Sequence, residues 1–438
     1  MRLSFGTNNR NSIELDISIP PHKVELYKTT HHPYYFFTQE YMQNSVGTRP
    51  PYYLCHLLNE FGYEAYVIAD QPVVGMRTPI LTNEIRQIHK AEGRSPITVY
   101  NETCLGNPLE GDVVVRWIMN KKVYVDGEPI PFSPDDLIFY WSSIYTESKN
   151  DKILWLPVVD TSIFNTDGAI EEERTGFCYY AHKYLRHNDG HVKLPEWLIA
   201  NGTSLCQDIK RSPLEIADIL RRSKVLYCYE PSAIMGEAEF CGCPTILVKT
   251  DYLSDFAFES IHFKYPIISE EEIDIDNPYL KVDPNHYSMF YEYYNKLLAS
   301  TGGSVKSFVE ITQVAAKTST HSNSEPDRLR VFCERHTPVY IYGGGTIARQ
   351  CHRVMKAMNI NMDGCIVSDS FEDLSSVKNS FHDFDVFHLS EIEHQKEHCG
   401  LVLAMSIENQ DEVIKNLERH KFLNYIRHSL LCPAVGYK

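Results

Sequence analysis

A carboxylate and a helix start lie a few residues apart near the middle of the chain, in a combination that suits a nucleotide diphosphate. Ser232 and Ala233 open a predicted helix, and the first backbone amides of a helix form a ready anion site. One turn in, Glu237 can accept hydrogen bonds from two vicinal hydroxyls. Phosphate donors beside a diol-binding carboxylate suit a nucleotide diphosphate with its ribose. The alternative is that Glu237 is a solvated residue on an exposed helix face.

Two strands and a helix must hold these residues. The apolar run Val225 to Tyr229 predicts a buried strand, and Ser232 can cap a helix that runs to about Cys241. Thr245 to Val248 predicts a second strand. Such a parallel βαβ unit binds its ligands beyond the carboxyl ends of its strands.

The same stretch resembles a known signature. Glu237-Ala238, followed by Gly242 and Pro244, is similar to the E-A-x-x-x-G-x-P motif of GT-B glycosyltransferases, in particular the large retaining family with paired glutamates. The resemblance implies that Glu237 holds the nucleotide ribose. The first glutamate of the pair should stand where this chain has Tyr229, and Glu230 is one position away. The resemblance therefore implies a catalytic, sugar-facing role for Glu230.

Length and composition exclude several classes of protein. A chain of 438 residues suits two or three domains, and its net charge of −16 argues against nucleic-acid binding. Met1 to Pro20 is polar and does not resemble a signal peptide, and no apolar run reaches membrane-spanning length. Twelve cysteines without a regular framework predict reduced thiols in the cytoplasm, and Cys241 and Cys243 are too close together for a zinc site. We therefore expect a cytoplasmic protein, which the resemblance places at the inner face of the membrane, without a bound metal.

Residues 1–158 predict a first α/β domain. Expected strands cover Ser12 to Ile19, Tyr34 to Phe37, Ala65 to Ala69, 113–118, Leu137 to Trp141 and Ile153 to Pro157, and Pro51 to Phe61 has helical spacing. In GT-B enzymes such a domain binds the acceptor.

Four residues of the first domain are candidates for the site. Gly47 stands where the GT-B fold often has a glycine-rich loop near the donor phosphates, or it belongs to a plain surface turn. Arg116 and Asn120 end a strand and are acceptor-side candidates, although Arg116 could instead pair with a carboxylate. His32 could serve as the general base of an inverting enzyme, or it is a surface residue.

Residues 159–317 predict the donor domain. Pro157, Asp160 and Phe164 resemble the GT-B crossover segment, and the strand within Gly176 to Lys183 would begin the domain. The resemblance implies that Lys183 meets the donor diphosphate and stabilises the leaving group, with Arg186 as a competitor.

The rest of this domain is predicted from caps and periodicity. Arg211 precedes a capping box at Ser212 to Glu215 and is a candidate for the diphosphate or for a salt bridge. The helix that follows should bury Leu214, Ala217 and Leu220. Two further helices are expected at Tyr287 to Leu298 and Val305 to Ala316, while Asp274 and Asp276 fit a solvated loop better than a metal site.

A linker at 318–336 and a small Rossmann-like module at 337–438 complete the prediction. Val339 to Tyr342 predicts a strand, and Gly343 and Gly345 belong to a G-x-G-x-x-A pattern that could bind a nucleotide. Alternatively these glycines serve only the turn and helix packing. About 100 residues should make at most half of a dinucleotide fold.

The expected fold class is α/β, with two facing Rossmann-like domains in the GT-B manner and a small third Rossmann-like domain. The resemblance implies a glycosyltransferase that needs no cofactor and takes a UDP- or GDP-sugar as donor. Its acceptor would be a glycan or a lipid-linked molecule in bacterial surface polysaccharide assembly, with peripheral membrane association. The alternatives are an NAD(P)-dependent oxidoreductase or epimerase acting through the third module, and a non-catalytic glycan-assembly scaffold.

Overall fold

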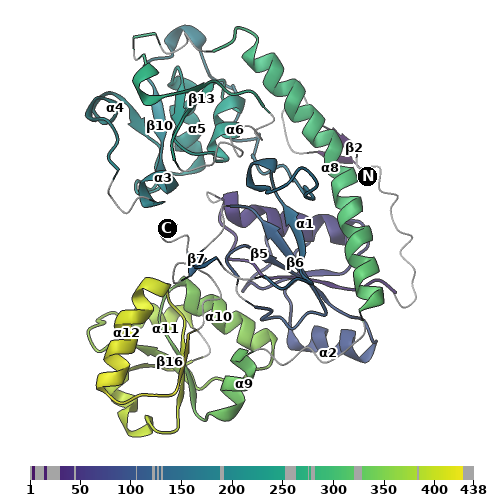
Figure 1. Cartoon of the computed structure of the whole chain (residues 1–438), viewed down its shortest axis with the longest axis vertical. Coiled ribbons are helices and arrows are strands. Elements are labelled where there is room, and N and C mark those ends of the chain that lie inside the picture. The colour runs from purple at the N-terminus through teal and green to yellow at the C-terminus, as the bar shows by residue number, and fades with distance from the viewer. Residues whose placement is uncertain are drawn as a thin grey trace.

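The protein forms three parallel five-stranded sheets, which confirms the predicted α/β class. The computed structural model describes residues 2–4, 14–16, 30–43, 46–104, 106–120, 124–125, 128–129, 132–187, 192–251, 263–274, 276–277, 282–319, 328–381 and 384–427. Figure 1 shows the sheets in three lobes that follow one another along the chain.

The first sheet has the strand order β4-β3-β5-β6-β9. Its strands are β3 (Tyr34–Phe36), β4 (Ala65–Val67), β5 (Ile97–Asn101), β6 (Val113–Ile118) and β9 (Leu137–Tyr140), accompanied by α1 (Arg49–Glu60) and α2 (Asn83–Ala91). All neighbouring strands are parallel. The predicted strand at 153–157 is reduced to a single bridge between Ile153 and Tyr140.

The second sheet repeats that order as β11-β10-β12-β13-β14. It contains β10 (Cys178–Tyr180), β11 (Thr203–Ser204), β12 (Leu226–Cys228), β13 (Thr245–Val248) and β14 (Ile267–Ile268), with α3 (His182–His187), α4 (Glu196–Asn201), α5 (Pro213–Arg222) and α6 (Ile234–Phe240). The capping box at Ser212 is confirmed because its side chain accepts from Glu215 N while Glu215 accepts from Ser212 N. Leu214 was predicted to be buried and is 64% exposed, since the inward face of α5 is set by Ala217 and Leu220.

The third sheet has the order β17-β16-β15-β18-β19. Its elements are α9 (Arg328–Arg335), β15 (Val339–Tyr342), α10 (Thr346–Ala357), β16 (Gly364–Val367), α11 (Leu374–Ser380), β17 (Val386–His388), β18 (Gly400–Leu403), α12 (Ile407–Arg419) and β19 (Tyr425–Arg427). Five strands in the order 3-2-1-4-5 exceed the half fold expected from the sequence. Helix α9 lies inside the predicted linker 318–336, whose residues 320–327 are outside the described residues.

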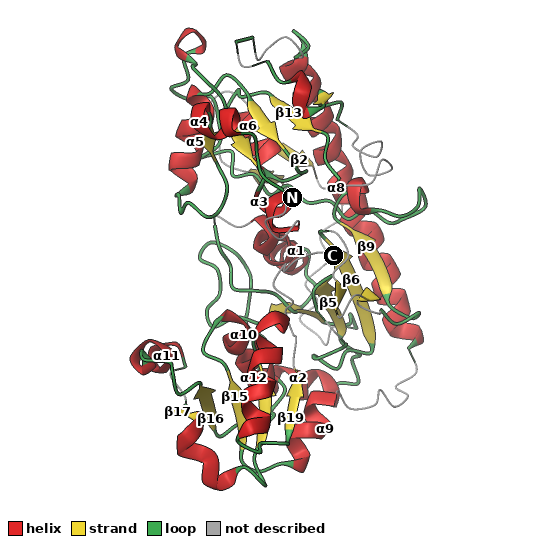
Figure 2. Cartoon of the chain, turned by 60° about the vertical axis from the view of Figure 1, so that its left-hand side comes forward, coloured by secondary structure: helices red, strands yellow, loops and turns green. Residues whose placement is uncertain are grey.

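One helix, α8 (His286–Thr318), joins the first two lobes. Figure 1 shows it in green along one side of both, and Figure 2 shows its lower half beside β9 and β6. The two helices predicted here are one continuous helix of 33 residues. Gly302 and Gly303 lie in its middle and do not end it. Phe240 of α6 packs edge-on against Tyr294 near the start of α8, while Tyr34 of β3 contacts Phe308 further on.

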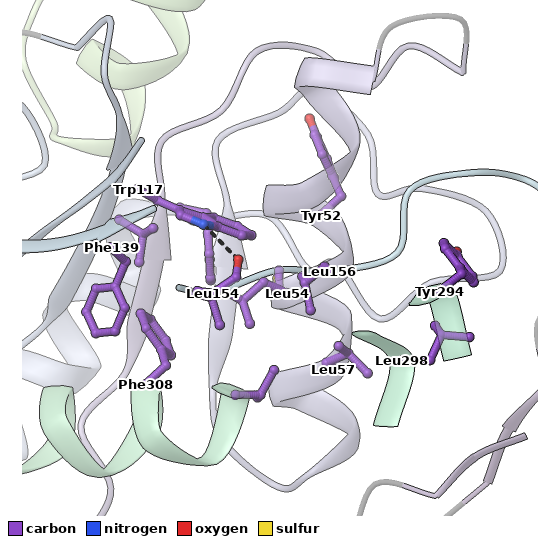
Figure 3. Packing of buried hydrophobic residues seen from close by; sticks show 14 of the residues in the cluster. Tyr52, Leu54, Leu57, Trp117, Phe139, Leu154, Leu156, Tyr294, Leu298 and Phe308 are labelled. Atoms are coloured by element: carbon purple, nitrogen blue, oxygen red, sulfur yellow. Dashed lines mark hydrogen bonds between the residues drawn. The ribbon is translucent and has the colours of Figure 1, made fainter. Parts of the chain in front are cut away.

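Figure 3 shows how the first sheet buries its α1 and α8 face. Trp117 of β6 is fully buried and donates from Nε1 to Leu154 O at 3.1 Å. Phe139 meets Phe308 of α8 edge-on, with ring centroids 5.1 Å apart. Since one hydrophobic cluster spans the first sheet, the second sheet and α8, these two lobes share a core.

The opposite face of the first sheet packs against the third lobe. Tyr35 and Tyr100 of the first sheet belong to the same buried cluster as Cys351 and Val354 of α10. At the rim of this contact, Arg330 donates from Nε to Glu110 Oε1 at 2.5 Å. The third lobe therefore covers a sheet face that would otherwise need helices of its own.

Two short antiparallel strand pairs lie outside the three sheets: β1 (Arg2–Ser4) with β2 (Glu14–Asp16), and β7 (Tyr124–Val125) with β8 (Glu128–Pro129). Only residues 14–16 of the strand predicted at Ser12 to Ile19 are described. Over the described residues, no helix combines the length and apolar character needed to cross a membrane.

Candidate functional site

A cavity of about 430 Å³ lies between the first and second lobes. Its lining comes mainly from the segments that follow strands: Gln39 after β3, Asn101 to Thr103 at the end of β5, Met119 and Asn120 after β6, and Trp141 to Tyr145 after β9 on one side. On the other side, Lys183 follows β10 and Pro231 to Glu237 follow β12. The carboxyl edges of both sheets therefore face one cavity.

The strand orders explain why the lining residues gather there. In both sheets the chain lays its second strand on one side of the first strand and its third strand on the other. The reversal points lie between β3 and β5 and between β10 and β12, and open α/β sheets bind ligands beyond the carboxyl ends of strands at such points. The cavity touches the segments after all four of these strands.

Glu237 lies in α6 and lines the cavity with only 6% of its surface exposed, so it is not a solvated helix residue. Its Oε1 is 3.6 Å from the guanidinium of Arg49, which belongs to the first lobe. Arg49 in turn donates to Val158 O at 2.5 Å and to Gln43 O. Burial raises the pKa of Glu237 to about 7, while the charge of Arg49 opposes that rise. The ion pair spans the two lobes beside the cavity.

Gly47 is placed beside this pair by the 3-10 turn Val46–Thr48, which leads into α1. It lines the cavity, and a Cβ built on it would meet nothing within 4 Å. The space over Gly47 is thus open to a ligand.

Lys183 and Asn120 meet across the cavity. Lys183 stands in the first turn of α3, directly after β10, and its Nζ donates to Asn120 Oδ1 at 3.5 Å. Asn120 follows β6 of the opposite sheet, and both residues line the cavity. The structure therefore brings together a predicted donor-side cation and a predicted acceptor-side amide.

Ser232 and Ala233 line the cavity, while Arg211, the predicted diphosphate contact, does not. Helix α6 begins at Ile234 and has Ala233 at its N-cap position without a side-chain cap, so the prediction that Ser232 caps this helix is wrong. Arg211 precedes α5 and is absent from the cavity lining. The side chain of Arg186 lies outside the described residues.

Glu230 lies below the cavity rather than in its wall. It has no exposed surface, and its Oε2 accepts a hydrogen bond from Tyr184 N at 2.5 Å. Tyr184 is in the first turn of α3, so this carboxylate caps the helix that carries Lys183. In this position Glu230 supports Lys183 instead of facing a sugar.

Arg116 is a structural residue, which corrects its prediction as an acceptor contact. Side chains alternate along β6, so Trp117 faces the core below α8 and Arg116 faces the third lobe. Its guanidinium donates to Asp136 Oδ2 at 2.8 Å and to two backbone carbonyls, and it lies over the Tyr100 ring at 4.9 Å. These contacts use its donors away from the cavity.

His32 is at the wrong edge of the sheet to act as a base in this cavity. It precedes β3, and its Nδ1 is 3.0 Å from Ser95 O, just before β5. Its backbone N–H donates to Gln313 of α8 at 2.9 Å. His32 and Ser95 both precede their strands, at the amino ends, whereas the cavity is at the carboxyl ends, so the prediction of a catalytic His32 is corrected.

Glu102 is a cavity residue that the sequence reasoning missed. It follows β5, where Asn101 Oδ1 accepts from both the backbone N and the hydroxyl of Thr103 and so shapes the turn. The Glu102 carboxylate is 6% exposed and accepts from Met119 N at 2.9 Å. The signal was available in the run ITVYNE, a strand pattern that ends in a carboxylate.

Close packing accounts for Gly343 and Gly344 of the third lobe. Gly343 has a φ of +132°, and a Cβ there would lie 2.8 Å from Ala404 O. A Cβ on Gly344 would lie 2.8 Å from Val377 Cγ2, whereas Gly345 has open space. These contacts agree with the expectation that the glycines serve the turn and the helix packing.

Among the residues that the structure describes, no group of three or more His, Cys, Asp or Glu side chains could hold a metal ion. The described cysteines form no disulfide.

Comparison with known proteins gives a likeness of structure only. No family model matches the chain, and no curated protein matches it. The spinosyn forosaminyltransferase SpnP is 11% identical, with a TM-score of 0.35 over 66% of this chain and 100% of its own. The glycosyltransferase SnogD from Streptomyces nogalater has 11% identity and a TM-score of 0.34 over 65% and 99%. The rhamnosyltransferase SpnG, complexed with thymidine diphosphate, has 10% identity and a TM-score of 0.28 over 65% and 98%. Since these TM-scores are below 0.5, function has to be argued from the cavity itself.

Proposed function

We propose that the chain is a glycosyltransferase that moves a sugar from a nucleotide diphosphate to an acceptor hydroxyl. The observation that carries the proposal is the single cavity onto which the reversal points of two parallel sheets open. One sheet can then hold the donor and the other the acceptor, with the reacting atoms between them.

The second lobe is the donor side of this proposal. Lys183 follows the first strand of its sheet and presents an ammonium group to the cavity, where it can neutralise charge that develops on a diphosphate leaving group. Glu237 supplies a carboxylate for the ribose hydroxyls, and Ser232 and Ala233 line the same cavity. When a ribose binds, Glu237 would give up its contact with Arg49 and accept hydrogen bonds from the ribose hydroxyls instead.

The first lobe is the acceptor side. Asn120, Glu102 and the aromatic rings of Trp141 and Tyr145 line it, which suits a polyhydroxylated acceptor with one polar and one apolar face. We infer a glycan or lipid-linked acceptor, as in the assembly of bacterial surface polysaccharides, and a UDP- or GDP-sugar donor that reacts without a metal. Closure of the lobes about α8 would expel water from the cavity and protect the donor from hydrolysis.

The paired-glutamate mechanism is not part of the proposal. It needs a carboxylate beside the sugar at the first position of the pair, and Glu230 instead caps α3 below the cavity.

Two measurements test this function. The protein is titrated with UDP, GDP, TDP and NAD in an isothermal calorimeter, and nucleotide release is measured with a panel of nucleotide sugars. Lys183→Met should weaken binding of a nucleoside diphosphate by 10-fold or more and lower turnover by about 10²-fold or more. Arg211→Met is the matched control, because it removes a predicted diphosphate cation that does not line the cavity. NAD binding that survives Lys183→Met would favour an oxidoreductase, and binding of none of the four would favour a scaffold.

A further inference from the structure

The proposed transfer requires a group that takes the proton of the acceptor hydroxyl, and one carboxylate in the cavity has no part in donor binding. Glu237 is engaged with Arg49, and Glu230 is buried under α3. Glu102 lines the cavity from the opposite sheet, at the end of the central strand β5. We propose that Glu102 is the general base of the transfer and that the reaction inverts the configuration of the anomeric carbon. This inference rests on the proposed function.

The position of Glu102 is fixed by the local structure. The turn held by Asn101 directs residue 102 between the ends of β5 and β6, and the hydrogen bond from Met119 N, 2.9 Å long, orients the carboxylate. Hydrogen bonds from Met119 N and from the backbone amide of Glu102 itself leave further lone pairs on the carboxylate, which has about four acceptor sites in all. A base held in this way needs little reorganisation when the acceptor arrives.

The electrostatic surroundings suit a base. Burial raises the pKa of Glu102, with the Met119 amide and the charge of Lys183 opposing the rise. Among the described residues, no Lys, Arg or His approaches its carboxylate within ion-pair distance, whereas Glu237 has such a partner. The titratable groups around this corner of the cavity are Lys183 of α3, Tyr145 after β9, and Glu230, whose charge acts on Tyr145 together with that of Glu102. A carboxylate with a raised pKa is a stronger base than an exposed one.

The base and the cation of the proposed reaction come from different sheets. Glu102 follows β5 of the first sheet, and Lys183 follows β10 of the second. The acceptor oxygen would form its bond to the anomeric carbon as its proton passes to Glu102. The bond from that carbon to the phosphate oxygen would break with its electron pair going to the diphosphate, beside Lys183. Attack from one side and departure to the other is an in-line displacement, which inverts the carbon.

The test uses water as the acceptor, so that no acceptor needs to be identified. The full-length protein is incubated with UDP-α-glucose, GDP-α-mannose and TDP-α-glucose, and the first-formed free sugar is assigned by ¹H NMR before it mutarotates. A β-anomer from the wild type is expected, whereas an α-anomer would overturn the inference.

Glu102→Gln keeps the size of the side chain and removes the base. The rate of sugar release should fall by roughly 10²- to 10⁴-fold, while the dissociation constant for the nucleoside diphosphate stays within twofold and reports correct folding. Glu102→Asp should recover part of the lost rate. Glu334→Gln on α9, where the side chain is 65% exposed and outside the cavity lining, is the matched control and should leave the rate unchanged.

A Gln variant that releases sugar at the wild-type rate would overturn the inference and leave the transferase in place. If the wild type neither binds a nucleoside diphosphate nor releases one from any of these sugars, the proposed function fails and the inference fails with it.

Discussion

Replacement of Glu237 by Gln gives a stability change whose size and pH dependence follow from the structure. The carboxylate is buried between the two lobes, and its pKa is raised from the ordinary 4.5 to about 7 because burial outweighs the attraction of Arg49. A shift of one pKa unit corresponds to 1.36 kcal/mol, so this shift corresponds to about 3 kcal/mol in the free energy of unfolding.

The sign follows from proton binding. Between pH 4.5 and 7 the folded protein holds the Glu237 proton and the unfolded chain releases it, so the wild type loses stability as the pH rises through this range. Gln carries no charge at any pH and resembles the protonated glutamate. We therefore expect the two proteins to be equally stable near pH 4.5 and the variant to be more stable by about 3 kcal/mol at pH 8.

The assay is thermal unfolding of both proteins in matched buffers from pH 4.5 to 8. For a domain of this size, about 3 kcal/mol corresponds to a gain of roughly 6–12 °C in Tm at pH 8. Glu310→Gln on α8, where the side chain is 64% exposed, is the control and should give no pH-dependent difference. A variant less stable than the wild type at pH 8 would refute the reasoning, since the Arg49 ion pair would then outweigh the cost of burying the charge.

Three further substitutions test the fold around the site. Arg116→Met should destabilise the first lobe by about 3–5 kcal/mol in urea unfolding, because Asp136 is left buried without its partner; nucleotide affinity should not change, and a selective loss of affinity would return Arg116 to the cavity. Gly303→Ala should stabilise the protein by roughly 0.5–1 kcal/mol, since the new methyl group meets nothing within 4 Å in the middle of α8; a lower unfolding midpoint would contradict this. Gly344→Ala should lower Tm through its clash with Val377, whether or not NAD is present; NAD-dependent rescue would instead indicate a nucleotide site in the third lobe.

The sequence alone determined the local elements and much of the donor side. An apolar run and a Gly-x-Pro stop predicted β12, α6 and β13 nearly to their ends, because these signals act over a few residues. Since ligands gather at the carboxyl ends of parallel strands, the same pattern placed Glu237 and Ser232 at one edge of a sheet, and the family resemblance added Lys183. All three line the cavity.

Only the tertiary structure decided what lies opposite that edge. Side chains along β6 point alternately to the two faces of the sheet, and the fold decides which face Arg116 takes. His32 precedes β3, and the fold decides that the cavity lies at the other end of that strand. Gly302 and Gly303 look like a helix break in the sequence, yet packing on both lobes holds α8 continuous. Glu102 and Lys183 are 81 positions apart in the sequence. Their shared cavity exists because two separately wound sheets turn the same edge toward each other, a long-range contact that no local pattern encodes.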